Sequence, residues 1–423
     1  MRRTSRRRGE AEIEAAEAPA RSAHRLPRSG ILSVASCPSP IIGECPLVRF
    51  IHTADWHLGM QAHFLPAEAR ARFAQDRFDA VRRIAHLASA HSCAFVLAAG
   101  DLFDSNHVDR RVIAKAIDAL SAFTVPVLLL PGNHDPLDQS SVYRSADWME
   151  HAPPNAIVPQ QSGTVADLQI DGVEVVAAPW QTKHQLHDPL SDCLQMPPVP
   201  HRSVRVIVGH GIVDDLSPSA EDPALIRAER IRDLLSEGAA HYLALGDRHS
   251  VTEIAQTGGR AFYSGTPVST DYGETDPNRV LLVSLDRDRC QVEPQAIGSW
   301  TFERVHRELT SDADVDQLIH TLQAMPSKPT TAVKLALQGS LTLAAHAKLE
   351  EALERCGETL AALDTWERHT DLIVEPDEAD LQALDVSGYV REALQQLRTE
   401  AASPGEQAAV ARDALNLLYR LAS

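Results

Sequence analysis

The sequence predicts an α/β fold, with a layered domain over residues 48–297 followed by a smaller α+β domain and a helical tail. Five short apolar runs have the length and composition of buried strands: Val48–Ile51, Phe95–Ala99, Val125–Leu130, Val204–Val208 and Tyr242–Leu245. Amphipathic stretches at Ala67–Ala90 and Arg110–Phe123 separate the first three runs. This βαβαβ order indicates strands covered by helices. Asp171-Gly172, between two β-branched stretches, predicts the two-residue turn of a hairpin.

Length and composition place the chain among globular proteins. It has 423 residues, enough for two or three domains, with 44% hydrophobic and 5% aromatic residues. Six scattered cysteines lack the spacing of a disulfide framework or a zinc knuckle, and this favours a reducing cytoplasm. No apolar run approaches the roughly 20 residues of a bilayer span, so no membrane partner is expected. The net charge of -18 repels nucleic acid, which would need local basic patches, metal ions or a partner protein to bind.

The first 47 residues show no core pattern. The stretch "MRRTSRRRGE" is basic and "CPSPIIGECP" is rich in turn residues, but no uninterrupted apolar segment of a signal peptide precedes Val48. We therefore expect residues 1–47 to be a disordered extension. A misassigned start site is the alternative.

The chain after Ile297 has a different character. In residues 298–385, "TAVKLALQG" and "HTDLIVEP" are typical of strands, while "DVDQLIHTL" and "AHAKLEEALERC" are typical of helices. This alternation predicts a small α+β domain. Residues 386–423 contain two more amphipathic helices, "YVREALQQLRTE" and "EQAAVARDALNLLYRLA". They either bind a partner or pack on their own core.

Each of the five predicted strands ends in polar residues that can bind a metal ion. The stretches are "ADWH", "GDLFD", "GNHD", "GHG" and "GDRH". They supply the following side chains: Asp55, His57, Asp101, Asp104, Asn133, His134, Asp135, His210, Asp247 and His249. One such motif alone is more typical of a turn or a solvated side chain. Because the carboxyl ends of strands in an open α/β sheet form a common crevice, the five together predict one site.

The ligand types indicate a metal centre for phosphate chemistry. Carboxylates, imidazoles and an amide oxygen suit Mn, Fe or Zn, and the absence of thiolates argues against a structural zinc or iron–sulfur site. Two ions about 3.5–4 Å apart can activate a water and neutralise the attacking and leaving oxygens of an in-line displacement at phosphorus. We therefore expect a two-metal phosphoesterase.

The order of the motifs resembles that of the calcineurin-like metallophosphoesterases. More narrowly, "IHTADWHLG", "GDLFD" and "SGTP" are similar to the SbcD-type DNA repair nuclease subunit of bacteria, over Val48 to Glu274. The resemblance implies a two-sheet sandwich flanked by helices and, after it, a C-terminal domain that caps the active site.

The resemblance also implies roles for single residues. Asp55, His57 and His249 would hold the first ion, Asp101 would bridge, and Asn133 and His210 would hold the second. His134 would be the general acid or stabilise developing charge, with Asp135 orienting it. Of two further candidates, Arg248 would contact a phosphate and His107 would be a second catalytic histidine, although a solvated surface position is the alternative for both.

Asp247 departs from the family pattern. The last motif of the family usually reads Gly-His-x-His, and here it reads Gly-Asp-Arg-His, so a carboxylate stands where a second-metal imidazole is expected. A carboxylate can still bind Mn, and we expect a metal site with altered preference. The alternative is a site that has lost an ion.

By resemblance, the expected function is a Mn-dependent DNA nuclease subunit, a 3'-5' exonuclease with endonuclease activity. An SbcC-like ATPase of the SMC family would be its partner, bound near the C-terminal tail, in a heterotetramer that contains a homodimer of this chain. The alternatives are a metal-depleted scaffold subunit and a phosphodiesterase acting on small nucleotides.

Overall fold

The computed structural model describes residues 47–423, with gaps. The gaps are at residues 194–196, 198, 200–202, 218–221, 376–386, 403–406, 409, 412–413, 416 and 419–423. The predicted extension at residues 1–47, except its last residue, and much of the second tail helix lie outside the described residues. The cysteines within the described part, Cys93, Cys193, Cys290 and Cys356, are free.

The first sheet carries three of the five predicted strands. Its order is β12-β11-β1-β2-β3-β4. The bounds are β1 Val48–Thr53, β2 Phe95–Ala99, β3 Val127–Leu130, β4 Ala156–Ile157, β11 Arg279–Leu285 and β12 Cys290–Ala296. Strands β1 to β4 are parallel, whereas β11 pairs antiparallel with β1 and β12 pairs antiparallel with β11.

The second sheet carries the other two predicted strands. Its order is β5-β6-β7-β8-β10-β9. The bounds are β5 Gly163–Thr164, β6 Val173–Ala177, β7 Val204–His210, β8 Tyr242–Gly246, β9 Thr252–Glu253 and β10 Ala261–Tyr263. Strands β6, β7, β8 and β10 run parallel, and the short strands β5 and β9 pair antiparallel at the two edges.

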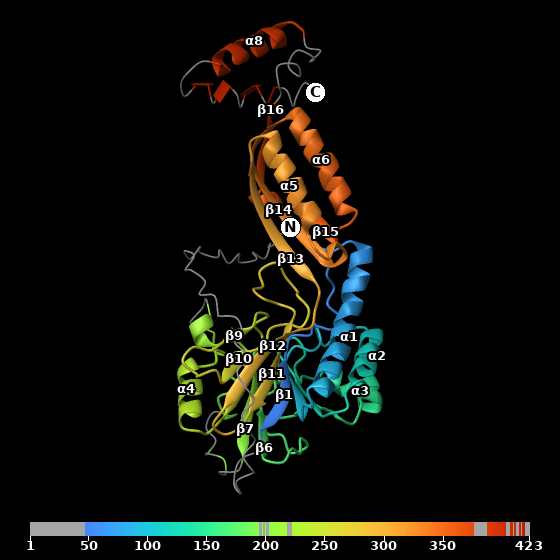
Figure 1. Ribbon diagram of the computed structural model, residues 1–423, viewed down its shortest axis with the longest axis vertical. Helices are drawn as coiled ribbons and strands as arrows, with labels where there is room; N and C mark the ends of the chain where they lie inside the picture. The colour runs from blue at the N-terminus through green and yellow to red at the C-terminus, as the bar shows by residue number, and fades with distance from the viewer. Residues whose placement is uncertain are drawn as a thin grey trace, which may run out of the picture. The chain divides into compact units, whose positions relative to one another are not determined.

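The two sheets pack face to face and helices cover their outer faces (Figure 1). Phe50 and Leu97 of the first sheet share one buried cluster with Val206 and Tyr242 of the second. Helices α1 (Ala67–Ala90), α2 (Arg110–Leu120) and α3 (Ala146–His151) pack on the other face of the first sheet, and α4 (Ala228–Ser236) packs on the second. Buried strands and amphipathic helices therefore form the two-sheet sandwich that the resemblance implies.

A third sheet follows in the chain. It has the order β13-β14-β15, with β16 also paired to β14. Its strands are β13 Thr301–Leu309, β14 Thr331–Thr342, β15 Ala362–Thr365 and β16 Asp371–Glu375, and its helices are α5 Asp312–Ala324 and α6 Leu343–Gly357. Apolar side chains of both helices and the sheet form one buried cluster. This confirms a smaller C-terminal part made of strands and helices, but its strand pairs are all parallel and the α+β expectation is in this respect wrong. Helix α8 (Tyr389–Ala401) corresponds to the first predicted tail helix.

The predicted hairpin is only partly correct. Gly172 has a φ of 72°, and Ile170 pairs with Val173 across the turn as expected. The arm before the turn does not continue as a strand, however, because the antiparallel partner of β6 is the two-residue strand β5, further back in the chain. Among the described residues, no helix is long and apolar enough to cross a membrane.

Candidate metal centre

The register of strand pairing within each sheet brings the predicted ligands to one edge of the sandwich. Thr53 pairs with Ala98 and Ala99 pairs with Leu130, so β1, β2 and β3 end close to one another. The loops that follow stay paired, since the amide of Asp55 donates to the carbonyl of Gly100 over 3.0 Å. In the second sheet, His210 pairs with Gly246, directly before Asp247.

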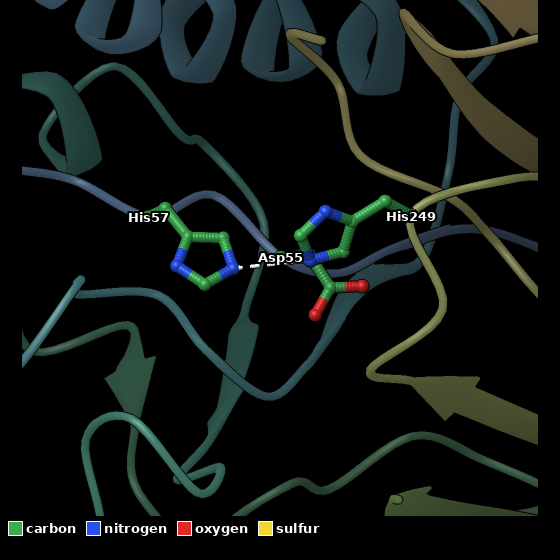
Figure 2. Close-up of side chains that lie close together, drawn as sticks. All are labelled: Asp55, His57 and His249. Atoms are coloured by element: carbon green, nitrogen blue, oxygen red, sulfur yellow. Dashed lines mark hydrogen bonds between the residues drawn. The ribbon is translucent and has the colours of Figure 1, made fainter. Parts of the chain in front are cut away.

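The first group of ligands consists of Asp55, His57 and His249, whose ligand atoms lie within 4.8 Å of one another. The Nε2 atoms of the two histidines are 3.2 Å apart, although 192 positions separate them in the chain. Figure 2 shows the two imidazole rings close together, with the carboxylate of Asp55 nearby. Two metal-binding nitrogens and a carboxylate thus converge on one point.

The second group consists of Asp55, Asp101 and His210, all of them buried. The Oδ2 atom of Asp101 lies 3.4 Å from Nε2 of His210 and 3.9 Å from Nε2 of His57. Asp101 therefore lies between the two groups, while Asp55 belongs to both. Asn133 completes this side, since its Oδ1 atom is 2.8 Å from Nε2 of His210.

The donor atoms fit a cation. Nδ1 of His210 lies 2.8 Å from the carbonyl oxygen of Ala99, which can only accept, so Nδ1 carries the proton. In a neutral ring Nε2 is then an acceptor that can bind an ion, and it faces the side-chain amide of Asn133. This amide can turn its NH2 group toward Nε2 and Asp101 as a donor, or its oxygen to the same place as a ligand for an ion. The facing Nε2 atoms of His57 and His249 can likewise share a proton or both bind one ion.

Two glycines allow the close approach of these loops. A Cβ atom on Gly100, which has a φ of 96°, would overlap the imidazole of His210. A Cβ atom on Gly246 would overlap the carbonyl oxygen of Ala99. No side chain fits either space, and "GDLFD" and "GDRH" therefore begin with glycine for a packing reason.

Backbone strain is concentrated at the same place. Asp55, His57, Asp101 and Asp247 have φ values of 54°, 43°, 53° and 98°, a region that non-glycine residues rarely adopt. Such conformations cost about 1–3 kcal/mol each and persist where the surrounding structure imposes them. Their clustering marks this edge as functional.

The charges of the second group stabilise one another. Burial raises the pKa of Asp55 to about 7, although the nearby His249 and His210 oppose this shift. Burial also disfavours ionisation of Asp101, but the charge and hydrogen bond of His210 outweigh it and hold the pKa of Asp101 below its usual range. For His210, burial is outweighed by the charges of Asp101, Asp247 and Asp55, and its pKa lies well above the usual value.

The histidines of the first group differ in charge preference. Burial lowers the pKa of His57 against a hydrogen bond with Asp104. The pKa of His249 is raised to about 9, because the hydrogen bond with Glu274 and the charge of Asp55 exceed the penalty of burial. The buried cluster as a whole therefore attracts positive charge.

His134 lies beside the first group, but its partner is not the predicted Asp135. Its ring meets that of His57 edge-on, with centroids 4.8 Å apart. Its Nδ1 atom lies 2.8 Å from the backbone carbonyl oxygen of Asp104, which therefore accepts from it. His134, His57 and Asp104 also form a third group of neighbouring ligand atoms. The expectation that Asp135 orients His134 is wrong in this respect.

Asp135 instead joins the loops that follow β2 and β3. Its carboxylate accepts from the backbone amides of Leu102, Phe103 and Gly132 over 3.0, 3.1 and 2.8 Å, and from the Tyr143 hydroxyl over 2.6 Å. It is fully buried. Its side chain turns inward because four donors converge there, an arrangement that no local sequence pattern reveals.

Asp247 lies at the margin of the second group. Its Oδ1 atom is 3.7 Å from Nε2 of His210, and its backbone amide donates to Asp55 over 3.0 Å. Among the described residues, none of the three groups of ligand atoms includes it. Two further candidates do not belong to the three groups of ligand atoms: His107 is exposed, and the exposed Arg248 donates to the Thr252 hydroxyl over 2.8 Å.

A cavity of about 260 Å³ opens next to the centre. Asp247, His249 and Glu274 line its inner side, Ile212 and Leu216 form an apolar wall, and Arg248 also lines it. Its contact with two of the predicted ligands leaves room for a substrate beside the metal groups. Glu274, which contacts His249, was not among the predicted site residues, because it belongs to no strand-end motif.

Comparison with known proteins identifies this arrangement. Residues 48–251, which contain all five strand-end motifs, match the calcineurin-like phosphoesterase family. Residues 48–251 belong to that family. The metallophosphoesterase resemblance drawn from the motifs is thereby confirmed, and the three groups offer ligand atoms for divalent ions.

Several relatives extend the similarity. The DNA double-strand break repair protein Mre11 of Methanosarcina mazei is 25% identical over 72% of this chain and 48% of its own length. The SbcD subunit of the nuclease SbcCD of Staphylococcus epidermidis is 22% identical over 58% of this chain and 67% of its own length. The uncharacterized metallophosphoesterase YhaO of Bacillus subtilis is 24% identical over 80% of this chain and 84% of its own length. The match thus covers about half of the length of the Methanosarcina mazei protein.

Proposed function

We propose that this metallophosphoesterase is a DNA nuclease subunit that hydrolyses phosphodiester bonds with two divalent ions, Mn in the first instance. The observation that carries the proposal is the convergence of two ligand groups on the shared Asp55, with Asp101 between them and His134 alongside. The similarity to proteins named for double-strand break repair and for the SbcCD nuclease favours DNA over a small phosphodiester.

The proposed ligand sets follow the two groups. Asp55, His57 and His249 would hold the first ion, Asn133 and His210 would hold the second, and Asp101 would serve both. Asp247 would add a carboxylate to the second. Bound there, the ions would supply an activated water and Lewis acidity toward the phosphate oxygens.

The chain's own residues then orient the reaction. The backbone amide of His134 donates to Oδ1 of Asp101 over 2.9 Å, which fixes the loop beside the bridging carboxylate. The Asp104 carbonyl holds Nδ1 of His134 and leaves its Nε2 atom for the substrate. To donate to the leaving oxygen or to the charge that develops at phosphorus, Nε2 must carry a second ring proton, because the proton on Nδ1 is held by the Asp104 carbonyl. Asp135 serves by keeping these two loops together.

We place the protein in the cytoplasm, as a homodimer that binds an SbcC-like SMC-family ATPase through residues 386–423, with 3'-5' exonuclease and endonuclease activity. The net charge of -18 supports a role for the partner, because this subunit by itself repels DNA at long range.

A nuclease assay tests the function. The purified protein is incubated with linear duplex and single-stranded DNA, with Mn or Mg, alone and with the ATPase encoded by a neighbouring gene with a P-loop and long heptad repeats. We expect Mn-dependent cleavage that the ATPase increases. An Asp101→Ala protein purified in parallel controls for contaminating nucleases. Hydrolysis of small phosphodiesters without any cleavage of DNA would contradict the proposal.

One observation favours a second candidate. Asp247 replaces an imidazole of the family pattern and lies outside the three ligand groups. If the second ion is lost for this reason, the protein is a scaffold subunit with little hydrolytic activity. Metal stoichiometry of the purified chain separates the two: two ions support the nuclease, and one supports the scaffold.

A further inference from the structure

We propose that Glu274 is a positioning residue of the metal centre, which holds the His249 ring so that its Nε2 atom faces Asp55 and His57. The Oε1 atom of Glu274 lies 3.1 Å from Nδ1 of His249, on the side of the ring opposite Nε2. Thr270 Oγ1 lies 2.7 Å from the same nitrogen. The inference rests on the proposed metal centre and adds a residue that the family motifs do not contain.

The carboxylate of Glu274 is itself held firmly. Its side chain is only 6% exposed. The backbone amide of Thr270 donates to both oxygens over 3.0 Å, and the Ser269 hydroxyl donates to Oε2 over 2.7 Å. The Thr270 hydroxyl donates to Oε1 as well. Because an ionised carboxylate only accepts, the His249 nitrogen that faces it must carry a proton. This leaves Nε2 of a neutral ring as the metal-binding atom.

The loop that carries Glu274 is tied to the loop that carries Asp55 and His57. Arg77, a buried residue of α1, donates from Nη2 to the carbonyl of Ser269 over 3.4 Å and from Nη1 to the carbonyl of Trp56 over 2.6 Å. Trp56 lies between the two ligands in the chain. One guanidinium therefore connects both sides of the first ligand group, so that Glu274 positions His249 against a fixed partner.

This geometry has a defined chemical consequence. A carboxylate that accepts from the second nitrogen of a metal-binding histidine fixes its tautomer, orients the ring and raises its basicity. Removal of such a partner typically weakens metal binding by about 10- to 100-fold. The effect should fall on the ion held by His249, and spare the ion held by Asn133 and His210.

The test compares metal binding by the full chain and its variants after removal of metal with a chelator. Glu274→Gln and Glu274→Ala are titrated with Mn by calorimetry, and Glu174→Gln is the matched control. Glu174 is a carboxylate that pairs with Arg205 over 2.9 Å, away from the three ligand groups. We expect one of two sites to weaken by about 10- to 100-fold in both Glu274 variants and neither site to change in the control. Melting temperatures in chelator are measured alongside, because Glu274→Gln places an amide donor beside the donors of Ser269 and Thr270 and should itself lower stability.

Three outcomes would overturn the proposal: unchanged Mn binding in Glu274→Gln and Glu274→Ala, equal weakening of both sites, or the same loss in Glu174→Gln. The test is independent of DNA. If the wild type binds two ions and hydrolyses bis-p-nitrophenyl phosphate but cuts no DNA, the nuclease proposal fails while the role of Glu274 stands.

Discussion

The imidazoles of His57 and His249 meet at their Nε2 atoms, 3.2 Å apart, across the junction of the two sheets. Each ring is held from behind by a carboxylate, since Nδ1 of His57 lies 3.4 Å from Asp104 and Nδ1 of His249 lies 3.1 Å from Glu274. The pair thus joins the loop after β1 to the loop after β8. A metal ion between them would connect the two sheets as well as bind substrate, so metal content and stability should be linked.

Asp101→Ala should abolish the Mn-dependent hydrolysis of bis-p-nitrophenyl phosphate. Its Oδ2 atom lies near both His57 and His210, and loss of this carboxylate separates the two proposed ions from a shared nucleophile. The measurement is the rate of nitrophenolate release at saturating Mn. Asp118→Ala, a change at an exposed helix residue, is the control and should retain the wild-type rate. An active Asp101→Ala protein would rule out the two-metal mechanism.

His134→Asn should reduce the rate by about two to four orders of magnitude with metal content unchanged. The backbone amide of residue 134, which donates to Asp101, is kept in this variant, so the loop should hold its position. Kinetics and metal analysis are measured on the same preparation. Loss of an ion would show instead that His134 is a ligand.

Asp247→His should strengthen metal binding at the weaker site and shift its preference from Mn or Mg toward zinc-like ions, because imidazole suits borderline metals better than a carboxylate does. The Oδ1 atom of Asp247 is already 3.7 Å from Nε2 of His210, which places the substituted ring near the second group. Calorimetric titration and plasma emission give affinity and stoichiometry. If the wild type binds two ions tightly and the substitution changes neither count nor preference, Asp247 is not a ligand.

Asp135→Asn should destabilise the protein by about 3 kcal/mol or more. The carboxylate accepts from three backbone amides and from Tyr143, and an amide side chain in its place turns one acceptor into a donor among buried donors. Urea unfolding in chelator measures the change. Tyr143→Phe removes one of the four donors, and we expect a loss of about 1 kcal/mol. Stability unaffected by Asp135→Asn would show that the carboxylate does not hold the loops together.

His52 should make stability depend on pH. It is buried between the sheets, 3.0 Å from the Tyr242 hydroxyl and 3.1 Å from the Leu245 carbonyl, and burial lowers its pKa from 6.5 to about 3. Between pH 6.5 and 3, the unfolded chain therefore binds a proton at His52 that the folded chain does not bind. Its contribution to stability is complete above pH 6.5 and declines by about 1.4 kcal/mol per pH unit as the pH falls toward 3.

The measurement is urea unfolding of the wild type and of His52→Gln in chelator, at pH 7 and pH 5. Between these values the wild type should lose about 2 kcal/mol more of its free energy of unfolding than the variant, which lacks the imidazole at position 52 but keeps all other titrating groups. Equal losses in both proteins would show that His52 does not carry the effect.

Local sequence patterns were enough to predict the five strands that carry the ligands and the residues at which those strands end. Buried strands require apolar runs and sharp turns require glycine, and both requirements are local. The runs that became β1, β2, β3, β7 and β8 could therefore be recognised, and the rule for strand ends in α/β sheets placed Asp55, Asp101 and His210 together. The antiparallel strands β11 and β12 were not predicted; the place of β11 beside β1 depends on pairing between distant parts of the chain, and β12 follows as the neighbour of β11.

The direction in which each side chain points depends instead on tertiary contacts. Asp135 follows His134 in the chain, yet it turns to the amides of Leu102 and Phe103, because those unpaired donors lie buried beside it. Glu274 has no motif around it. Its carboxylate contacts His249, and Ser269 and Thr270 of the same loop donate hydrogen bonds to that carboxylate. The physical reason is common to both. A buried polar group must find a partner, and the identity of that partner depends on chain segments that are distant in sequence.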